Sequence, residues 1–96
     1  MPAANPAAAV RLPARLDLNA AAPLAEQLCA LRRRNVVIDA SQVERLGGLC
    51  LQVLLSARAA WAADGAVFEV SDPSSAFCED LVLFGAHELA GEGALR

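Results

Sequence analysis

The sequence predicts a single α/β domain in which helices pack on a mostly parallel sheet. Short β-branched segments alternate with longer segments whose apolar residues have helical spacing, in the order strand, helix, strand, helix, strand, helix. Strands separated by helices are usually parallel and joined by right-handed crossovers. The 96 residues suffice for one domain, and 56% of them are apolar, which allows a dense core.

The first strand is expected after residues 1–9, an Ala- and Pro-rich segment that we expect to be a disordered leader. Apolar residues of one parity predict that this strand is half-buried: Val10, Leu12, Leu16 and Leu18. Pro13 lies among them and cannot donate a backbone hydrogen bond. The strand should therefore lie at an edge or bend there.

The first helix is predicted over residues 19–34, with Leu24, Leu28 and Leu31 as its apolar stripe. Its start is open between Asn19 as the cap and Pro23 in the first turn. We interpret residues 32–34, which are all arginine, as the charged C-terminal end of this helix, where cations suit the helix dipole. Asn35 suits a left-handed stop.

A buried central strand is predicted at residues 36–38, which are β-branched and flanked by polar residues. Gly47 and Gly48 lead into a second helix over residues 49–63, whose core stripe is Cys50, Val53 or Leu54, Ala57 and Trp61. The first two turns of this helix are apolar almost all round. It is therefore either deeply buried or covered by a partner.

The last strand is predicted at residues 67–70. Residues 72–74 (Asp-Pro-Ser) predict a helix start, with Asp72 as the cap and Pro73 at the first helical position. The core stripe expected for this third helix is Phe77, Leu81 and Phe84. Gly85 should end the helix, and residues 86–90 could add one turn. We expect the ordered domain to span residues 10–91 and residues 92–96 to form a flexible tail.

Composition argues against several classes of function. The net charge is −3 and no basic stripe is present, so nucleic-acid binding is not expected. The cysteines (Cys29, Cys50 and Cys78) are spread out inside apolar runs, which predicts buried free thiols in a reducing compartment. No segment resembles a signal peptide or is long enough to span a membrane, so we expect a cytoplasmic protein.

Catalytic and cofactor-binding residues are not expected either. The only histidine, His87, has no nucleophile beside it in the sequence. Glu79 and Asp80 are adjacent helical residues whose side chains diverge, as on a solvated face. Gly47-Gly48 lacks the Lys-Ser/Thr of a phosphate-binding loop, and a tight turn explains it better than a ligand site. We expect no cofactor and no metal.

Residues 36–65 resemble the central part of STAS domains. The resemblance rests on Asp39-Ala40-Ser41 at the end of a strand and on the run from Leu46 to Leu55 that opens a helix. This run and residues 61–65 look most like the small STAS proteins of bacterial chemotaxis operons. The likeness extends more weakly over residues 10–91. It implies a single-domain STAS-like fold with a mixed, mostly parallel four-stranded sheet and helices packed on it.

The sequence departs from this family at one position that bears on regulation. In STAS antagonists switched by phosphorylation, a Ser or Thr acceptor stands at the helix start after an Asp. Here these two positions fall on Gly48 and Gly47, and neither can accept a phosphate. The resemblance therefore implies a docking surface without the covalent switch, and we expect a cognate kinase to leave residues 46–50 unmodified.

The resemblance implies a non-enzymatic signalling adaptor that docks through the loop 41–48 and the helix 49–63. The expected partner is a regulatory protein, either a chemotaxis histidine kinase complex or an anti-sigma kinase, and the protein itself is expected to be a monomer or weak dimer. The alternative is a STAS subunit that partners an ABC lipid-transport ATPase. The expected partner-binding residues are Ser41, Leu46, Gly47, Gly48, Leu49 and Gln52. Gly48→Glu should weaken docking and spare the fold.

Overall fold

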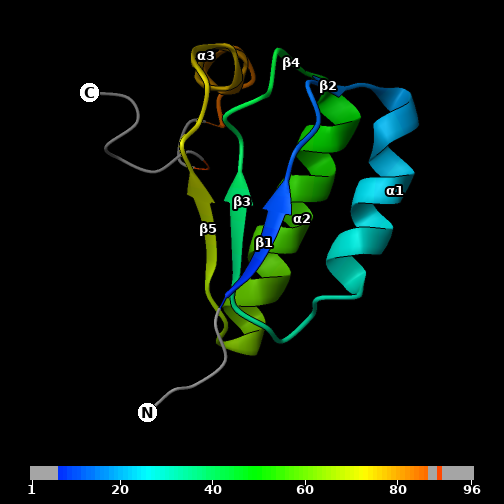
Figure 1. The fold of residues 1–96 in the computed structure, drawn as a ribbon, viewed down its shortest axis with the longest axis vertical. Coiled ribbons are helices and arrows are strands. Elements are labelled where there is room, and N and C mark those ends of the chain that lie inside the picture. Colours follow the sequence, from blue (N-terminus) through cyan, green and yellow to red (C-terminus); the bar gives the residue numbers. More distant parts are fainter. Residues whose placement is uncertain (1–6, 87–88, 90–96) are drawn as a thin grey trace.

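The computed structural model describes residues 7–86 and 89. Helices and strands alternate in the predicted order, with two additional two-residue strands (Figure 1). The elements are β1 (Ala8–Arg11), β2 (Arg15–Leu16), α1 (Leu18–Cys29), β3 (Val36–Asp39), β4 (Arg45–Leu46), α2 (Gly48–Asp64), β5 (Phe68–Ser71) and α3 (Ser75–Leu83). The predicted single α/β domain is confirmed.

The main sheet has the strand order β1-β3-β5, and both ladders are parallel. β2 and β4 form a separate parallel pair, so residues 7–86 contain a three-stranded and a two-stranded sheet instead of one mixed four-stranded sheet. Pro13 explains the division. The chain leaves the ladder after Leu12, whose N–H donates to the Asp39 carbonyl at 2.9 Å, and it pairs again only at β2.

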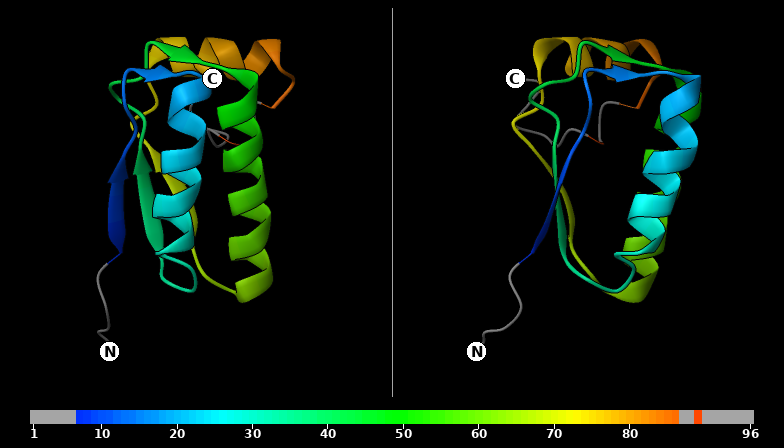
Figure 2. Two further views of the ribbon diagram at one scale, coloured as in Figure 1. Left: turned by 90° about the vertical axis from the view of Figure 1, so that its right-hand side faces the viewer. Right: turned by 45° about the vertical axis from the view of Figure 1, so that its right-hand side comes forward.

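Helices α1 and α2 lie side by side on one face of the main sheet, and α3 lies across its end (Figures 1 and 2). Val10, Val36 and Ile38 point from the sheet into the core and are at most 1% exposed. Trp61 and Phe77 are the largest fully buried side chains of the described part of this cluster, which also includes Leu16. The strands therefore bury the face that their alternation predicts.

Leu18 is not a strand residue, contrary to the predicted alternation. It begins α1 and is 76% exposed. The chain turns into the helix at Asp17, whose side chain accepts hydrogen bonds from the N–H groups of Asn19 and Ala20. Asp17 is thus the N-cap, and neither Asn19 nor Pro23 marks the start of the helix. The period-2 strand pattern therefore stops before Leu18.

α1 also ends earlier than predicted, at Cys29 instead of residue 34. The left-handed residue is Arg33, with φ of 72°, and not Asn35. The Asn35 side chain has another role, because it accepts a hydrogen bond from the Val67 N–H at 2.9 Å and so links the starts of β3 and β5. The prediction of three buried thiols is wrong for Cys29, which is exposed, whereas Cys50 is buried and Cys78 is half-buried.

The second and third helices follow their predicted spans closely. Leu54 rather than Val53 holds the core position of α2. α3 is capped by Ser74 and not by Asp72 as predicted, because the Ser74 hydroxyl accepts a hydrogen bond from the Phe77 N–H at 3.0 Å. Among the described residues, no helix combines the length and apolarity needed to cross a membrane.

The termini can be compared with the predictions only in part. β1 begins at Ala8, inside the segment expected to be a leader. Residues 1–6, His87 and the expected tail 92–96 lie outside the described residues. Within the expected extra turn at 86–90, Ala86 and Leu89 are described, and both are buried.

Candidate docking surface

Ser41 shapes the turn that follows β3. Its side chain is exposed, and its backbone N–H donates to Asp39 Oδ1 at 2.9 Å. Hydrogen bonds from Ser41 lower the pKa of the Asp39 carboxyl, and the bond from the Ser41 side chain has a larger effect than the bond from its backbone. The Arg11 guanidinium adds a smaller effect in the same direction. Ser41 is therefore accessible, and its observed bonds serve the turn.

Leu46 was predicted to lie on the docking surface, but the structure buries it. Its side chain is 3% exposed and packs in the core. Its backbone N–H donates to Asp80 Oδ2 at 2.9 Å, which ties β4 to α3. Asp80 is half-buried, in contrast to the solvated position that the sequence suggested, whereas its neighbour Glu79 is exposed. The pair diverges as predicted, but one member has a structural bond.

Gly47 is required by a close approach of two backbone segments. Its N–H donates to the Leu16 carbonyl at 2.9 Å, and a Cβ added at Gly47 would lie 3.0 Å from that same oxygen. Real Cβ atoms seldom come so near a backbone oxygen. The glycine therefore serves the β2–β4 pairing and the entry into α2, which agrees with the tight-turn interpretation.

Gly48 and Leu49 open α2 and face outward. Gly48 is exposed and the Leu49 side chain is 51% exposed. The N-cap is Gly47, and α2 has no side-chain cap hydrogen bond among the described residues. Cys50 points inward, where its thiol donates to the Asp17 carbonyl at 3.3 Å and burial raises the pKa of the thiol. The helix start is therefore accessible on its Gly48–Leu49 side.

Phe84 was missed as a surface residue because the apolar stripe of α3 seemed to include it. Phe77 and Leu81 are fully buried, but α3 ends at Leu83 and Phe84 is the C-cap, 49% exposed. Leu83 beside it is 82% exposed. Gly85 could have indicated this exposure from the sequence. A glycine that ends a helix places the residue before it at the helix terminus, where the spacing of the apolar stripe no longer predicts burial.

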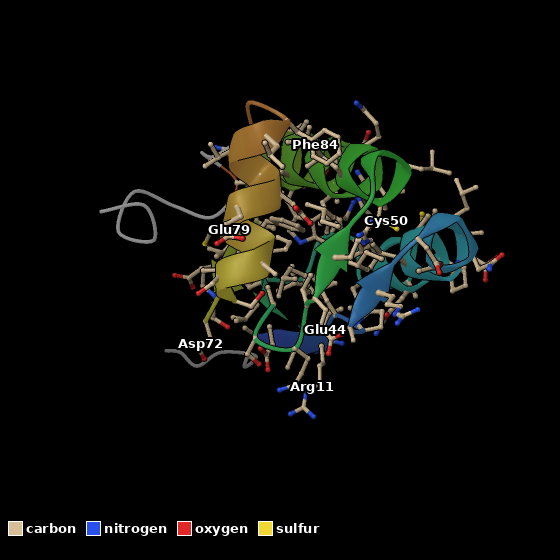
Figure 3. The ribbon with its side chains drawn as sticks, turned by 90° about the horizontal axis from the view of Figure 1, so that it is seen from above. Arg11, Glu44, Cys50, Asp72, Glu79 and Phe84 are labelled. Carbon is tan, nitrogen blue, oxygen red and sulfur yellow. The ribbon has the colours of Figure 1, made fainter. Side chains whose placement is uncertain are left out.

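These residues meet where the end of α3 reaches the start of α2 (Figure 3). A Cβ on Gly48 would lie 3.8 Å from Phe84 Cε1 and 4.0 Å from Cζ, which is ordinary van der Waals contact. We call this surface the α2–α3 corner and define it by Gly48, Leu49, Gln52, Leu83 and Phe84. Sequence reasoning found its α2 half and missed its α3 half.

Two hollows adjoin the α2–α3 corner and differ in charge. The first has a volume of about 560 Å³ and is lined by uncharged residues: Gly48, Leu49, Leu51, Gln52, Leu55, Phe84, Gly85 and Ala86. The second, of about 510 Å³, lies on the other side of Phe84 and includes Glu44, Arg45 and Asp80. The corner therefore has an apolar side and a charged side.

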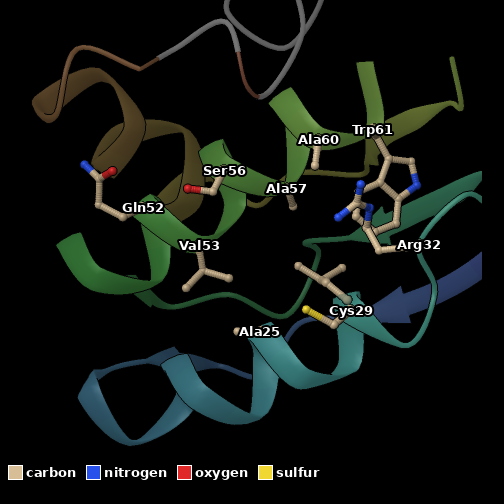
Figure 4. Close-up of a pocket in the computed structure, with 10 residues that line it drawn as sticks. Ala25, Cys29, Arg32, Gln52, Val53, Ser56, Ala57, Ala60 and Trp61 are labelled. Atoms are coloured by element: carbon tan, nitrogen blue, oxygen red, sulfur yellow. The ribbon is translucent and has the colours of Figure 1, made fainter. Parts of the chain in front are cut away.

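A further groove of about 340 Å³ runs between α1 and α2 (Figure 4). Its lining is mostly small and apolar, with Gln52 at one end and Arg32 beside Trp61 at the other. Within residues 7–86 and 89, no group of three or more side chains could hold a metal ion. The small, apolar lining of this groove suits van der Waals contact with apolar groups.

Comparison with protein families gives one match. The family model described as "Mlab, STAS domain" matches residues 2–91, which include every element of the fold and the whole α2–α3 corner. Comparisons with curated proteins and with solved structures give no match. The match agrees with the STAS resemblance inferred from the sequence and lends no support to the chemotaxis-linked branch.

Proposed function

This chain belongs to the STAS family, and from that membership we propose that it is the non-catalytic subunit that binds the ATPase of an ABC lipid transporter. This was the alternative hypothesis from the sequence. The MlaB-type family match favours it over a chemotaxis or anti-sigma kinase partner. Binding such an ATPase would keep the protein in the cytoplasm.

The observation that carries the proposal is the apolar α2–α3 corner. Leu49, Leu83 and Phe84 expose between 49% and 82% of their side chains around a helix start that carries no charged residue. Fully burying one such side chain contributes about 1.5–3 kcal/mol. A partner that covers the corner can therefore be held by contact alone, with no catalytic group needed on this chain.

The glycine at position 48 bears on how this contact is regulated. Phosphorylation at a helix start acts through a Ser or Thr hydroxyl, and Gly47-Gly48 supplies none. Under this proposal the ATPase is bound constitutively, and its assembly responds to concentration instead of to a kinase acting at this position.

The proposal is tested by titrating the purified protein with the ATPase subunit of the ABC lipid transporter from the same organism and measuring the heat of binding. We expect binding by the wild type and a loss of about tenfold or more in affinity for Gly48→Glu, because a charged side chain enters an apolar contact. The added Cβ has room, so the thermal midpoint should barely change.

Val67→Glu is the matched control, because Val67 is 51% exposed and immediately precedes β5, whose start lies at the opposite end of the sheet from α3 (Figure 1). It should bind like the wild type. If the wild type shows no binding at about 100 μM ATPase, the proposed partner is wrong. If the wild type and Gly48→Glu bind equally well, the docking surface lies elsewhere.

A further inference from the structure

We infer that Phe84 determines affinity at the α2–α3 corner, and that the surface it receives is an uncharged, apolar helix of the ATPase whose side chains enter the 560 Å³ groove beside the ring. This inference rests on the proposed function and deepens it. It assigns the main contact to the end of α3, in addition to the helix start that the sequence resemblance implies.

The backbone holds Phe84 in place through a Schellman motif. Gly85 adopts φ of 71°, its N–H donates to the Val82 carbonyl at 3.0 Å, and the Ala86 N–H donates to the Leu81 carbonyl at 2.8 Å. Leu81 is fully buried and Ala86 is 5% exposed, so both flanks of the motif are fixed in the core. An aromatic ring on such a support loses little conformational freedom when a partner covers it.

Gly48 leaves part of this ring open. A side chain at position 48 would begin 3.8 Å from the ring and would cover the part of it that faces the start of α2. Because Gly48 has no side chain, one continuous apolar surface runs from Leu49 to Phe84. The residue that replaces a phosphoacceptor therefore also makes the ring accessible.

The chemistry of the groove selects the occupant. Its lining residues, from Gly48 to Ala86, include no charged side chain, whereas Glu44, Arg45 and Asp80 lie in the hollow on the other side of Phe84. A phosphate or a charged peptide would lose its hydration in the groove without gaining an ionic partner. Leu and Phe side chains on a helix match both the lining and the groove beside α2. The groove shares Gly48, Leu49 and Gln52 with the surface proposed for the ATPase, so one partner would cover both.

The test measures affinity for the same ATPase subunit with Phe84→Ala and Phe84→Leu. We expect Phe84→Ala to weaken binding by about thirtyfold and Phe84→Leu by less, since Leu retains part of the apolar contact. Val67→Ala, which shortens another half-exposed apolar side chain, should leave affinity unchanged. Raising salt from about 50 to 500 mM should change wild-type affinity less than about threefold, because the contact is uncharged.

The outcomes separate this inference from the proposed function. If the wild type binds and Phe84→Ala binds equally well, the inference is overturned and the proposed function stands. If the wild type does not bind, both fail. Should Phe84→Ala not fold, Leu49→Ala shortens another apolar side chain that lines the groove and is expected to weaken binding about tenfold. A wild-type homodimer in light scattering that Phe84→Ala dissociates would assign the groove to a second copy and overturn the ATPase as its occupant.

Discussion

The two ends of α2 are both apolar, but their large apolar side chains are buried to different extents. At the C-terminal end Trp61 is 1% exposed, and its Nε1–H donates to the Arg34 carbonyl at 2.6 Å. The Phe68 ring lies 5.7 Å away, and the Arg32 guanidinium lies 5.9 Å from the Trp61 ring. Arg32 also pairs with Asp64 at 2.9 Å. Aromatic, hydrogen-bond and ionic contacts therefore all fall within the monomer.

At the N-terminal end of α2, hydrogen bonds hold Gly47 and Cys50, but large apolar side chains beside them stay exposed. Gly47 caps the helix without a side-chain hydrogen bond, and Leu49 and Phe84 remain about half exposed. Apolar surface of this kind, on a chain small enough to need most of its hydrophobic residues for its core, is typical of a surface that another protein covers. The comparison separates apolar residues that stabilise the fold from apolar residues available for binding, and the sequence alone does not make that distinction.

The largest change in stability is expected at the C-terminal end of α2, which we call the closed end because Trp61 is buried there. Trp61→Ala removes a buried ring together with its hydrogen bond, and we expect a loss of about 3–5 kcal/mol in the free energy of unfolding. Domains of this size have about 5–15 kcal/mol in total, so the variant should be close to unfolding. Urea denaturation followed by circular dichroism measures it. A loss below about 1 kcal/mol would mean that this end does not stabilise the fold as argued.

The next largest change in stability is expected at the N-terminal end of α2, which we call the open end. Its two adjacent glycines allow a matched pair of variants. Gly47→Ala places a Cβ 3.0 Å from the Leu16 carbonyl oxygen, which is backbone and already bonded to the Gly47 N–H. We expect it to lower the free energy of unfolding by about 1–3 kcal/mol. Gly48→Ala meets only the Phe84 ring at 3.8 Å and should leave stability unchanged or raise it by up to about 1 kcal/mol.

Denaturation of both glycine variants tests whether one residue serves the fold and its neighbour serves the surface. Equal losses for the two variants would contradict that division. If Gly47→Ala were as stable as the wild type, the Leu16 carbonyl would have to move easily, and the tight-turn interpretation of Gly47 would fail.

The helices and strands were predictable from the sequence because the spacing of their apolar residues follows the face that each element turns toward the core. Val36 and Ile38 alternate with half-buried neighbours in β3, and Cys50, Leu54 and Trp61 recur at helical spacing in α2. Three of the α2 residues named for docking, Gly48, Leu49 and Gln52, were accessible for the same reason: they lie off that stripe. Local pattern thus predicts which face of an element is buried.

Local pattern does not predict what happens where an element ends. Leu18 continues the parity of the strand and Phe84 continues the stripe of α3, yet both are exposed, because Asp17 already caps α1 and α3 ends at Leu83 with Phe84 as its C-cap. Leu46 is buried in the core, and its backbone N–H donates to Asp80, 34 positions later in the chain. Such long-range contacts have no signal in the spacing of one segment, which is why the burial of Leu46 was not predicted.

The smallest effect tests whether the ion pair contributes to the closed end. Arg32 and Asp64 are joined at 2.9 Å, but the Arg32 side chain is 46% exposed, so solvent screens the pair. A double-mutant cycle with Arg32→Ala and Asp64→Ala should give a coupling energy of about 0.3–1 kcal/mol that shrinks in about 1 M salt. Arg58→Ala, an exposed arginine on α2, is the control and should change stability by less than about 0.5 kcal/mol. A coupling that is zero at low salt would leave Trp61 and its hydrogen bond as the contacts that close this end. A coupling above about 2 kcal/mol would show that the pair is shielded from solvent far more than its exposure indicates.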